Sequence, residues 1–358
     1  KGIRACTIDF LTCDTTRYVQ RMCTEMRMSM NYIVLDLEWN QSCRGKEYTV
    51  LGLPFEIIQI GAVKLDENKK VTGKWERIIK PVVYTRLHGK VSEMLGITAD
   101  DLKSGQDFKS AACEFLEWCG EDYKFITWGG SDLTEFQRNM KYFGVENPFP
   151  FPLTYYDLQK LYSKVYSDGK TRRSLKIAIE ELGFLEDAEY HSAINDAIYT
   201  ARIFSNMDFD SVSIYESIDT YRIPSSRKEE IYMNFKTYEK YISKGFKTRD
   251  KAAEDRTARS CSCYICKSPM KRRIKWFATS SKNYYSVFVC DEHGLFKGRM
   301  KVKQSDDGQY YDVRILKHTD EDGVNKIIDK QKKEREHRRR KRMEEHKRKV
   351  EARNSCNK

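Results

Sequence analysis

Residues Tyr32–Trp39 read YIVLDLEW, and this stretch decides the fold that the sequence predicts. Only the two acids Asp36 and Glu38 interrupt its apolar side chains. An apolar run of this length is typical of a strand buried in a sheet. Side chains two positions apart point to the same face of a strand, so both carboxylates leave one face. A buried charge is costly unless it is paired or binds a metal, which makes the pair a candidate metal site.

Further strands and helices follow in an order that predicts an α/β sandwich with a mixed sheet. We expect strands at residues 57–65, 74–80, 124–128 and 153–158, and helices at residues 108–118, 132–143, 174–182 and 191–207. Residues 81–102 are expected to be irregular. Three strands come first and helices then alternate with strands, so residues 30–208 are predicted to form one α/β domain.

Three later residues can join the strand acids. Asp132 follows a strand and opens a helix, where an anion is well tolerated. Asp196 lies on the last helix, five residues after His191, so these two do not share one helical face. Carboxylates can hold two divalent ions for phosphodiester hydrolysis, and a histidine can accept a proton from the attacking water. Taken singly, Asp132 could instead be a helix cap and His191 a packed or exposed side chain.

The order of these residues resembles the DEDDh exonuclease superfamily, which includes RNase T and the epsilon subunit of DNA polymerase III. Its pattern is D-x-E on the first strand, Asp at a strand-to-helix junction and H-x4-D near the last helix, here Asp36, Glu38, Asp132, His191 and Asp196. Three further segments are similar: EIIQIGA at 56–62, LGIT at 95–98, and the helix from 174 to 183. The resemblance covers roughly residues 30–208.

This resemblance implies a ribonuclease H-like fold in which Asp36, Glu38, Asp132 and Asp196 bind two Mg²⁺ or Mn²⁺ ions and His191 is the general base. It is greatest with the branch that trims RNA 3′ ends, including histone-messenger and small-interfering-RNA exonucleases, and with sporulation-inhibitor-type bacterial exonucleases. The segment WGGSD at 128–132 departs from the many members that carry Asn four residues before the aspartate. The proofreading-polymerase branch is therefore disfavoured.

Members of this family hold the terminal nucleotide with apolar and aromatic side chains near the strand acids. The positions we expect to contact substrate are Leu37, Trp39, His88, Leu95 and Trp128. Trp39 follows the acid pair at a strand end and could stack on a base, and His88 could contact phosphate. Core packing is the alternative for Leu37 and Leu95, and plain exposure is the alternative for His88.

A second metal site is predicted downstream. Cys263-x2-Cys266 is followed after 23 residues by Cys290-x2-His293, a spacing that resembles a zinc ribbon. Four such ligands predict one structural Zn²⁺ in a module at residues 261–317, with Cys261 as an alternative to Cys263 and free buried cysteines as the alternative to a metal site. Cations interleave with aromatics between the pairs, which suits single-stranded nucleic acid; the aromatics could also be the module's own core.

The remaining segments carry less information. Residues 209–260 are expected to be a polar connector, with a charged helix over 233–255. Residues 318–358 should be a charged helical or disordered tail; its stretch 330–353 carries +8 of the net charge of +12, so the high pI says little about the catalytic domain. Residues 1–29 are either an upstream extension of the reading frame or a flexible arm. Eleven cysteines without a disulfide framework and no signal-peptide or membrane-spanning pattern predict a cytoplasmic protein without membrane contact.

Together these observations predict a divalent-metal-dependent 3′→5′ exonuclease. It would release nucleoside 5′-monophosphates from single-stranded 3′ ends, with RNA favoured over DNA, and its zinc module and basic tail could hold structured RNA. One alternative is a nucleic-acid-binding protein whose nuclease fold is catalytically silent. Another is a proofreading exonuclease bound to a DNA polymerase.

Overall fold

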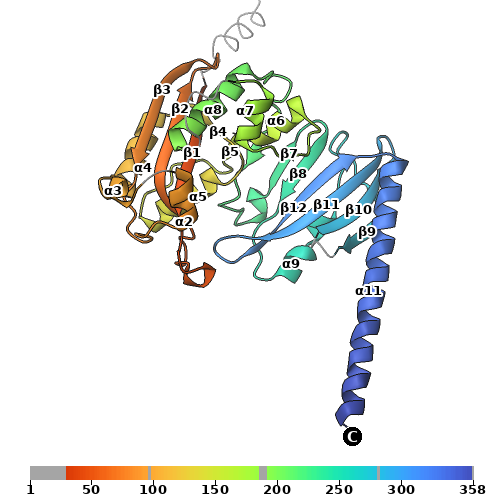
Figure 1. Ribbon diagram of the computed structural model, residues 1–358. Coiled ribbons are helices and arrows are strands. Elements are labelled where there is room, and N and C mark those ends of the chain that lie inside the picture. Colours follow the sequence, from red (N-terminus) through yellow and green to blue (C-terminus); the bar gives the residue numbers. More distant parts are fainter. Residues whose placement is uncertain (1–29, 96–97, 185–191, 280–282, 357–358) are drawn as a thin grey trace, which may run out of the picture. The chain divides into compact units, whose positions relative to one another are not determined.

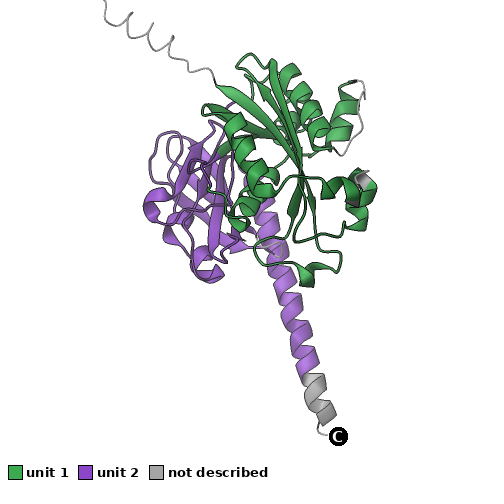
Figure 2. Ribbon diagram, turned by 90° about the vertical axis from the view of Figure 1, so that its left-hand side faces the viewer, with its two compact units in different colours: residues 1–146, 154–212 green, residues 147–153, 213–358 purple. Residues whose placement is uncertain are grey.

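A computed structural model describes residues 30–95, 98–184, 192–279 and 283–356 (Figure 1). The chain divides into two compact units, coloured separately in Figure 2. Unit 1 takes its described residues from 30–146 and 154–212, and unit 2 comprises residues 147–153 and 213–358. The segment at 1–29, for which two interpretations were open, lies outside the described residues.

Unit 1 is built on a mixed sheet in the order β3-β2-β1-β4-β5. Its strands are β1 (Asn31–Asn40), β2 (Glu56–Leu65), β3 (Val71–Ile78), β4 (Tyr123–Thr127) and β5 (Thr154–Asp157). β2 pairs antiparallel with β1 and β3, whereas β4 runs parallel to β1 and β5. The predicted mixed α/β sheet of the ribonuclease H-like type is confirmed.

Helices cover both faces of this sheet. They are α2 (Gly89–Leu95), α3 (Ala99–Lys103), α4 (Phe108–Cys119), α5 (Asp132–Tyr142), α6 (Leu158–Tyr166), α7 (Leu175–Glu181) and α8 (Ala193–Asn206), with a 3-10 turn η1 (Lys46–Tyr48). On one face, Tyr32 of β1 meets Phe204 of α8 edge to face at 4.9 Å. On the other, Trp75 of β3 packs on Phe115 of α4 at 5.2 Å. β2 is buried along almost its whole length, as a strand covered on both faces should be.

Three of these helices are absent from the prediction. α2 lies in residues 81–102, which were expected to be irregular, α3 begins there, and α6 follows β5 directly. α3 starts with a capping box between Thr98 and Asp101, and Asp157 caps α6 through the backbone N–H of Lys160. These caps initiate helices too short to show a clear apolar period.

Unit 2 is built on an antiparallel sheet in the order β7-β8-β12-β11-β10-β9. The strands are β7 (Ile231–Asn234), β8 (Tyr238–Ile242), β9 (Lys271–Ala278), β10 (Asn283–Cys290), β11 (Gly294–Gln304) and β12 (Tyr310–His318). Its other elements are β6 (Ser217–Ile218), η2 (Arg227–Glu229), α9 (Arg249–Ala253), α10 (Arg256–Arg259) and the long α11 (Glu321–Cys356). The predicted tail is therefore helical through residue 356.

The expectation of a helix over residues 233–255 was wrong. β7 and β8 form a hairpin there, and only the short helices α9 and α10 follow. β8 pairs with β12, from Ile242 opposite Val313 to Tyr238 opposite Lys317. The residues of β8 form a strand because they pair with β12, some seventy residues away in the sequence. This tertiary pairing overrides the local sequence, whose charged pattern is also compatible with a helix. The cysteine segment likewise belongs to this larger sheet and is not a separate module.

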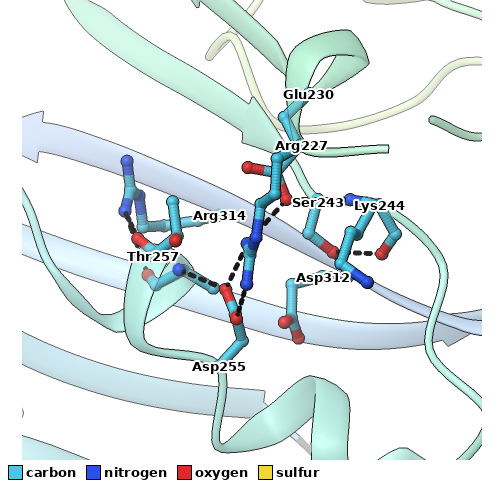
Figure 3. Close-up of polar contacts among 9 residues, drawn as sticks. Arg227, Glu230, Ser243, Lys244, Asp255, Thr257, Asp312 and Arg314 are labelled. Atoms are coloured by element: carbon cyan, nitrogen blue, oxygen red, sulfur yellow. Dashed lines mark hydrogen bonds and ion pairs between the residues drawn. The ribbon is translucent and has the colours of Figure 1, made fainter. Parts of the chain in front are cut away.

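A polar network lies at one face of this sheet (Figure 3). Arg227 forms a two-pronged ion pair with Asp255, and the Arg314 guanidinium donates to the carbonyls of Thr257, Ala258 and Ser260. Asp312, next to this network, is fully buried, and its carboxylate oxygens accept no hydrogen bond from a described residue.

Among the described helices of the chain, none combines the length and the apolar character that crossing a bilayer requires.

Candidate active site and metal centres

The two acids of β1 leave the sheet on the face that α8 covers. Asp36 lies opposite Gly61 of β2, and Glu38 lies opposite Gln59. The register shifts immediately after Glu38, so the regular pairing of β1 ends beside the two acids. Both carboxylates are partly buried at the end of a strand whose other side chains belong to the core.

Asp196 reaches these acids because α8 approaches β2 closely. A Cβ atom added to Gly61 would lie 2.1 Å from the carbonyl carbon of Ala193, so only glycine permits this approach. Gln59 accepts a hydrogen bond from the Ala193 backbone N–H at 3.1 Å, which satisfies one of the free N–H groups at the helix start. As a result, carboxylate oxygens of Asp36, Glu38 and Asp196 lie within 4.8 Å of one another.

Asp132 is not one of the three residues whose oxygens lie within 4.8 Å of one another, but its charge acts on Asp36 and Glu38. It is the first residue of α5 and is 7% exposed. The backbone N–H groups of Asp132 and Leu37 hydrogen bond to its carboxylate. The negative charge of Asp132 contributes to the raised pKa of Asp36, which shows that the two carboxylates are electrostatic neighbours.

Burial and mutual repulsion both disfavour ionisation of these acids. Burial, followed by repulsion from Asp132, Asp196 and Glu38, raises the pKa of Asp36 well above its ordinary value. Burial and the nearby Asp196 raise the pKa of Glu38 to about 8. Burial raises the pKa of Asp132 to about 7, although its backbone hydrogen bonds oppose the shift. A bound cation would reverse this balance and favour the ionised forms.

His191, the expected general base, lies outside the described residues. Directly after it in sequence, Ser192 is the N-cap residue of α8, the helix that carries Asp196.

The expected substrate-binding residues have different environments. Leu37 is 4% exposed and belongs to the core, which agrees with the packing alternative, and its contact with substrate stays a prediction. Trp39 is partly buried beside Phe55, with ring centroids 5.6 Å apart. The Trp128 indole donates to the Arg173 carbonyl at 3.3 Å and packs on Tyr162, and its contact with substrate stays a prediction.

The two remaining positions belong to the segment around α2. Leu95 is the last residue of α2 and is partly buried. His88 immediately precedes this helix; its Nδ1 atom is buried and makes no hydrogen bond to a described residue, whereas its backbone N–H donates to Asn40 at 2.9 Å.

Four residues that the sequence analysis did not single out as functional help to position this site. They are Asn40, Glu56, Gln59 and Gly61. Gln59 and Gly61 dock α8 against β2. Asn40 and Glu56 hold the chain segment that leads to His88. A polar or glycine residue within an apolar strand is the signal that could have identified them, because such a residue weakens a strand unless it has a partner.

The second metal centre belongs to unit 2. One ligand atom from each of Cys263, Cys266, Cys290 and His293 lies within 4.8 Å of the other three. The sulfur atoms of Cys266 and Cys290 are 3.6 Å apart, close to the separation of about 3.8 Å expected for two thiolates on a tetrahedral Zn²⁺. Hydrogen bonding by Ser268 lowers the pKa of Cys266 to about 6, which favours the thiolate form that binds metals.

Cys261, the alternative ligand, is not part of this group. It is buried in the apolar cluster that includes Tyr264 and Phe288, and burial raises the pKa of its thiol to about 11. Trp276 also belongs to the core of unit 2, since it packs on Phe288 and its indole donates to the Arg259 carbonyl at 2.9 Å. A base-stacking role for Trp276 is therefore not supported.

Residues 33–204 match the family model described as an exonuclease of the RNase T type. The matched range holds all four acids in the order that defines the DEDDh pattern. Unit 1 is a DEDDh-type exonuclease domain. The match begins in β1 and ends in α8, so it includes every element that positions the acids of this exonuclease domain.

The exonuclease domain is similar to curated proteins and solved structures. The 3'-5' exoribonuclease 1 of Rattus norvegicus is 26% identical over 161 residues, and that of Mus musculus is 25% identical over the same length. Each match covers 42% of this chain and 46% of the relative, so the chain spans less than half of their length.

Among solved structures, the nuclease domain of 3'hExo bound to rAMP has a TM-score of 0.45 and 21% identity and covers 54% of this chain and 98% of that one. E. coli exonuclease I with a dA16 oligonucleotide has a TM-score of 0.44 and 13% identity, and covers 73% and 55%.

Proposed function

We propose that the exonuclease domain hydrolyses single-stranded nucleic acid from the 3′ end and releases nucleoside 5′-monophosphates. The observation that carries this proposal is the meeting of Asp36, Glu38 and Asp196 within 4.8 Å. Among the described residues, every charged group that shifts the pKa of Asp36 or Glu38 is another carboxylate. Such a concentration of negative charge fits a site that divalent cations neutralise.

The residues present fit hard divalent cations. Asp36, Glu38, Asp132 and Asp196 would hold two Mg²⁺ or Mn²⁺ ions through carboxylate oxygens, the ligands these cations prefer. When bound, the ions supply stabilisation of the attacking hydroxide and of the leaving 3′ oxygen. The resemblance to DEDDh enzymes assigns His191 as the base that accepts the proton of the attacking water, a role for which a pKa near neutral is suited.

RNA is the substrate we favour over DNA. Support comes from the curated relatives, which are named exoribonucleases. Discrimination between the two substrates depends on contacts with the 2′-hydroxyl group.

The test uses the full chain with Mg²⁺ and single-stranded RNA and DNA that carry a 5′ label. We expect a ladder that shortens from the 3′ end, faster on RNA, and no shortening by Asp36→Asn/Asp196→Asn. Asn206→Asp is a matched control, because it changes an exposed position on the same helix as Asp196 and should retain activity. Binding without shortening of either strand would refute the proposal and support a silent nuclease fold. Turnover by the double variant would refute the metal-ligand assignment.

For unit 2 we propose that Cys263, Cys266, Cys290 and His293 bind one structural Zn²⁺. Four protein ligands fill the tetrahedral coordination of zinc and leave no open position for catalysis. Elemental analysis of purified protein should give one zinc per chain, reduced in Cys290→Ser and unchanged in Cys113→Ser, which alters an exposed cysteine of unit 1. Full zinc content in Cys290→Ser would contradict the assignment.

A further inference from the structure

A row of four cations runs along one face of β11 in unit 2. Lys297, Arg299, Lys301 and Lys303 are exposed and alternate with the buried residues Phe296, Gly298, Met300 and Val302. Because a strand rises about 3.3 Å per residue, the four side chains span roughly 20 Å. We call these four residues the β11 row.

Neighbouring strands extend the positive charge. Lys317 of β12 lies directly opposite Lys297, and Lys240 of β8 shares this face. On the other side, Tyr285 of β10 lies opposite Arg299, and the Lys330 ammonium of α11 is 4.7 Å from the centre of its ring. Like charges directly opposite one another destabilise a sheet, so the Lys297–Lys317 pair has an energetic cost.

The described residues form no ion pair with the β11 row, although Asp219 of unit 2 has a favourable electrostatic effect on Lys303. Among the described residues, no carboxylate lies within 4.0 Å of the charged groups of the row or of Lys317. Asp320 interacts electrostatically with Lys297, but its carboxylate accepts a hydrogen bond from the Gly323 backbone N–H. A row of exposed cations without paired carboxylates favours the binding of a polyanion from outside the chain.

Two of the four cations of β9, which the sequence suggested as a nucleic-acid surface, differ from the β11 row. Lys271 pairs with Asp291 at 3.2 Å, and Arg273 pairs with Glu321 at 2.7 Å. These two charges are already compensated within unit 2. The contrast favours β11 over β9 as the binding strand.

We propose that the β11 row, with Lys317, binds the phosphate backbone of the single strand that the exonuclease domain degrades. A row about 20 Å long fits successive phosphates of an extended strand better than one small anion. The inference rests on the proposed function for the identity of the ligand. It adds a second contact region for the substrate, remote in sequence from the acids.

The test measures binding separately from catalysis. The parent protein, and every variant compared with it, carries Asp36→Asn, so that no strand is cut during the titration. A chelator, which would remove zinc, is then not needed. Fluorescein-labelled oligouridine and oligothymidine of 20 nucleotides are titrated by anisotropy over a range of KCl concentrations. The variant is Lys297→Gln/Arg299→Gln/Lys301→Gln, and the matched control, Lys271→Gln/Arg272→Gln/Arg273→Gln, removes three charges from β9. Circular dichroism and zinc content show whether each variant is folded.

In the β11 variant we expect affinity to fall at least tenfold near 0.1 M salt. The slope of log K against log salt should decrease in magnitude by roughly 2, since each lost phosphate contact on a single strand contributes about 0.7. The β9 control should change affinity less than about twofold. Parental affinity and slope in a folded β11 variant, or an equal loss in the β9 control, would overturn the inference. If the unmutated chain degrades no strand but the β11 effect is present, the proposed function fails, and only the binding of a single strand by the β11 row stands.

Discussion

Asn40 and Glu56 lie opposite each other on β1 and β2, and their side chains hold the same loop. Asn40 donates to the carbonyls of Tyr84 and Arg86 at 2.7 and 3.0 Å, and accepts from the His88 N–H at 2.9 Å. Glu56 accepts from the N–H groups of residues 82–84 at 2.6–3.1 Å. Both side chains are at most 1% exposed. Two facing residues at the end of the catalytic strand therefore determine the path of the chain into α2.

Asn40→Ala should loosen this loop. The change removes three hydrogen bonds and leaves the buried Tyr84 carbonyl without its partner, a cost of about 1–3 kcal/mol in unfolding free energy. We expect KM for a short single strand to rise several-fold, while Mg²⁺ affinity stays near that of the parent because the acids are untouched. Asn206→Ala, which removes an exposed hydrogen bond to the Arg202 carbonyl, is the control. Unchanged KM and stability in Asn40→Ala would show that the loop needs no such support.

Gly61→Ala should displace α8. The added methyl group would lie 2.1 Å from the Ala193 carbonyl carbon, and this backbone atom cannot move without moving the helix that bears Asp196. We expect Mg²⁺ affinity, measured by calorimetry, to fall at least tenfold and activity to fall in parallel. Gly89→Ala is the control, because no atom lies within 4 Å of the position of its added Cβ. Parental metal affinity in Gly61→Ala would mean that the close approach does not position Asp196.

The stability of the metal-free protein should fall as pH rises from about 5 to 8. The pKa of Glu38 is raised to about 8 and that of Asp132 to about 7, above their values in the unfolded chain. For a raised acid pKa, the stabilising contribution is complete below the unfolded pKa and is lost as pH rises through the folded one. Mg²⁺ binds the ionised form, so the rise in Tm on adding Mg²⁺ should be larger at pH 8 than at pH 5.

The Glu38→Gln/Asp132→Asn variant isolates this effect. Its Tm should depend less on pH over the same range than that of the parent, and Mg²⁺ should barely change it. A parental Tm that rises from pH 5 to 8 without metal, or an equal Mg²⁺ effect at both pH values, would contradict the electrostatic account of the site.

Asp312→Asn should stabilise unit 2 at high pH. Burial, followed by repulsion from Asp255, raises the pKa of the Asp312 carboxyl to about 8. Its contribution to stability is complete below the unfolded pKa of about 4 and is lost as pH rises through 8, so ionisation costs on the order of a few kcal/mol. We expect hydrogen exchange of β12 amides to slow in the variant at pH 8, once intrinsic rates are taken into account, and to match the parent near pH 5.

Asp307→Asn is the control for that measurement. Asp307 is exposed, and hydrogen bonding by Ser305 lowers the pKa of its carboxyl. Its contribution to stability is therefore lost as pH falls, whereas that of Asp312 is lost as pH rises. Faster β12 exchange in Asp312→Asn at pH 8 would show that the ionised carboxylate has a stabilising partner.

The sequence predicted unit 1 well because its strands are long, apolar and close together along the chain. The run Tyr32–Trp39 is recognisable as a buried strand without knowledge of its partners, and β1 does contain it. The acids could be predicted because charged residues within or beside apolar elements need a reason to be there. Their order along the chain then matched the order in a known family.

The hairpin β7–β8 could not be predicted in this way. Its strands are only four and five residues long, and β8 is stabilised by pairing with β12. The roles of Asn40 and Glu56 were hidden for a related reason. Their partners are backbone groups of a loop more than 25 residues away, and no local pattern encodes such hydrogen bonds.

The central claim is that the acid cluster removes nucleotides from a free 3′ end. The most direct measurement compares a linear single strand labelled at its 3′-terminal nucleotide with a circular strand of the same sequence, both incubated with Mg²⁺. We predict that the first labelled product from the linear strand is a nucleoside 5′-monophosphate, that the circle stays intact, and that Asp36→Asn releases nothing. Cutting of the circle, or labelled fragments longer than one nucleotide as the first products, would contradict the claim.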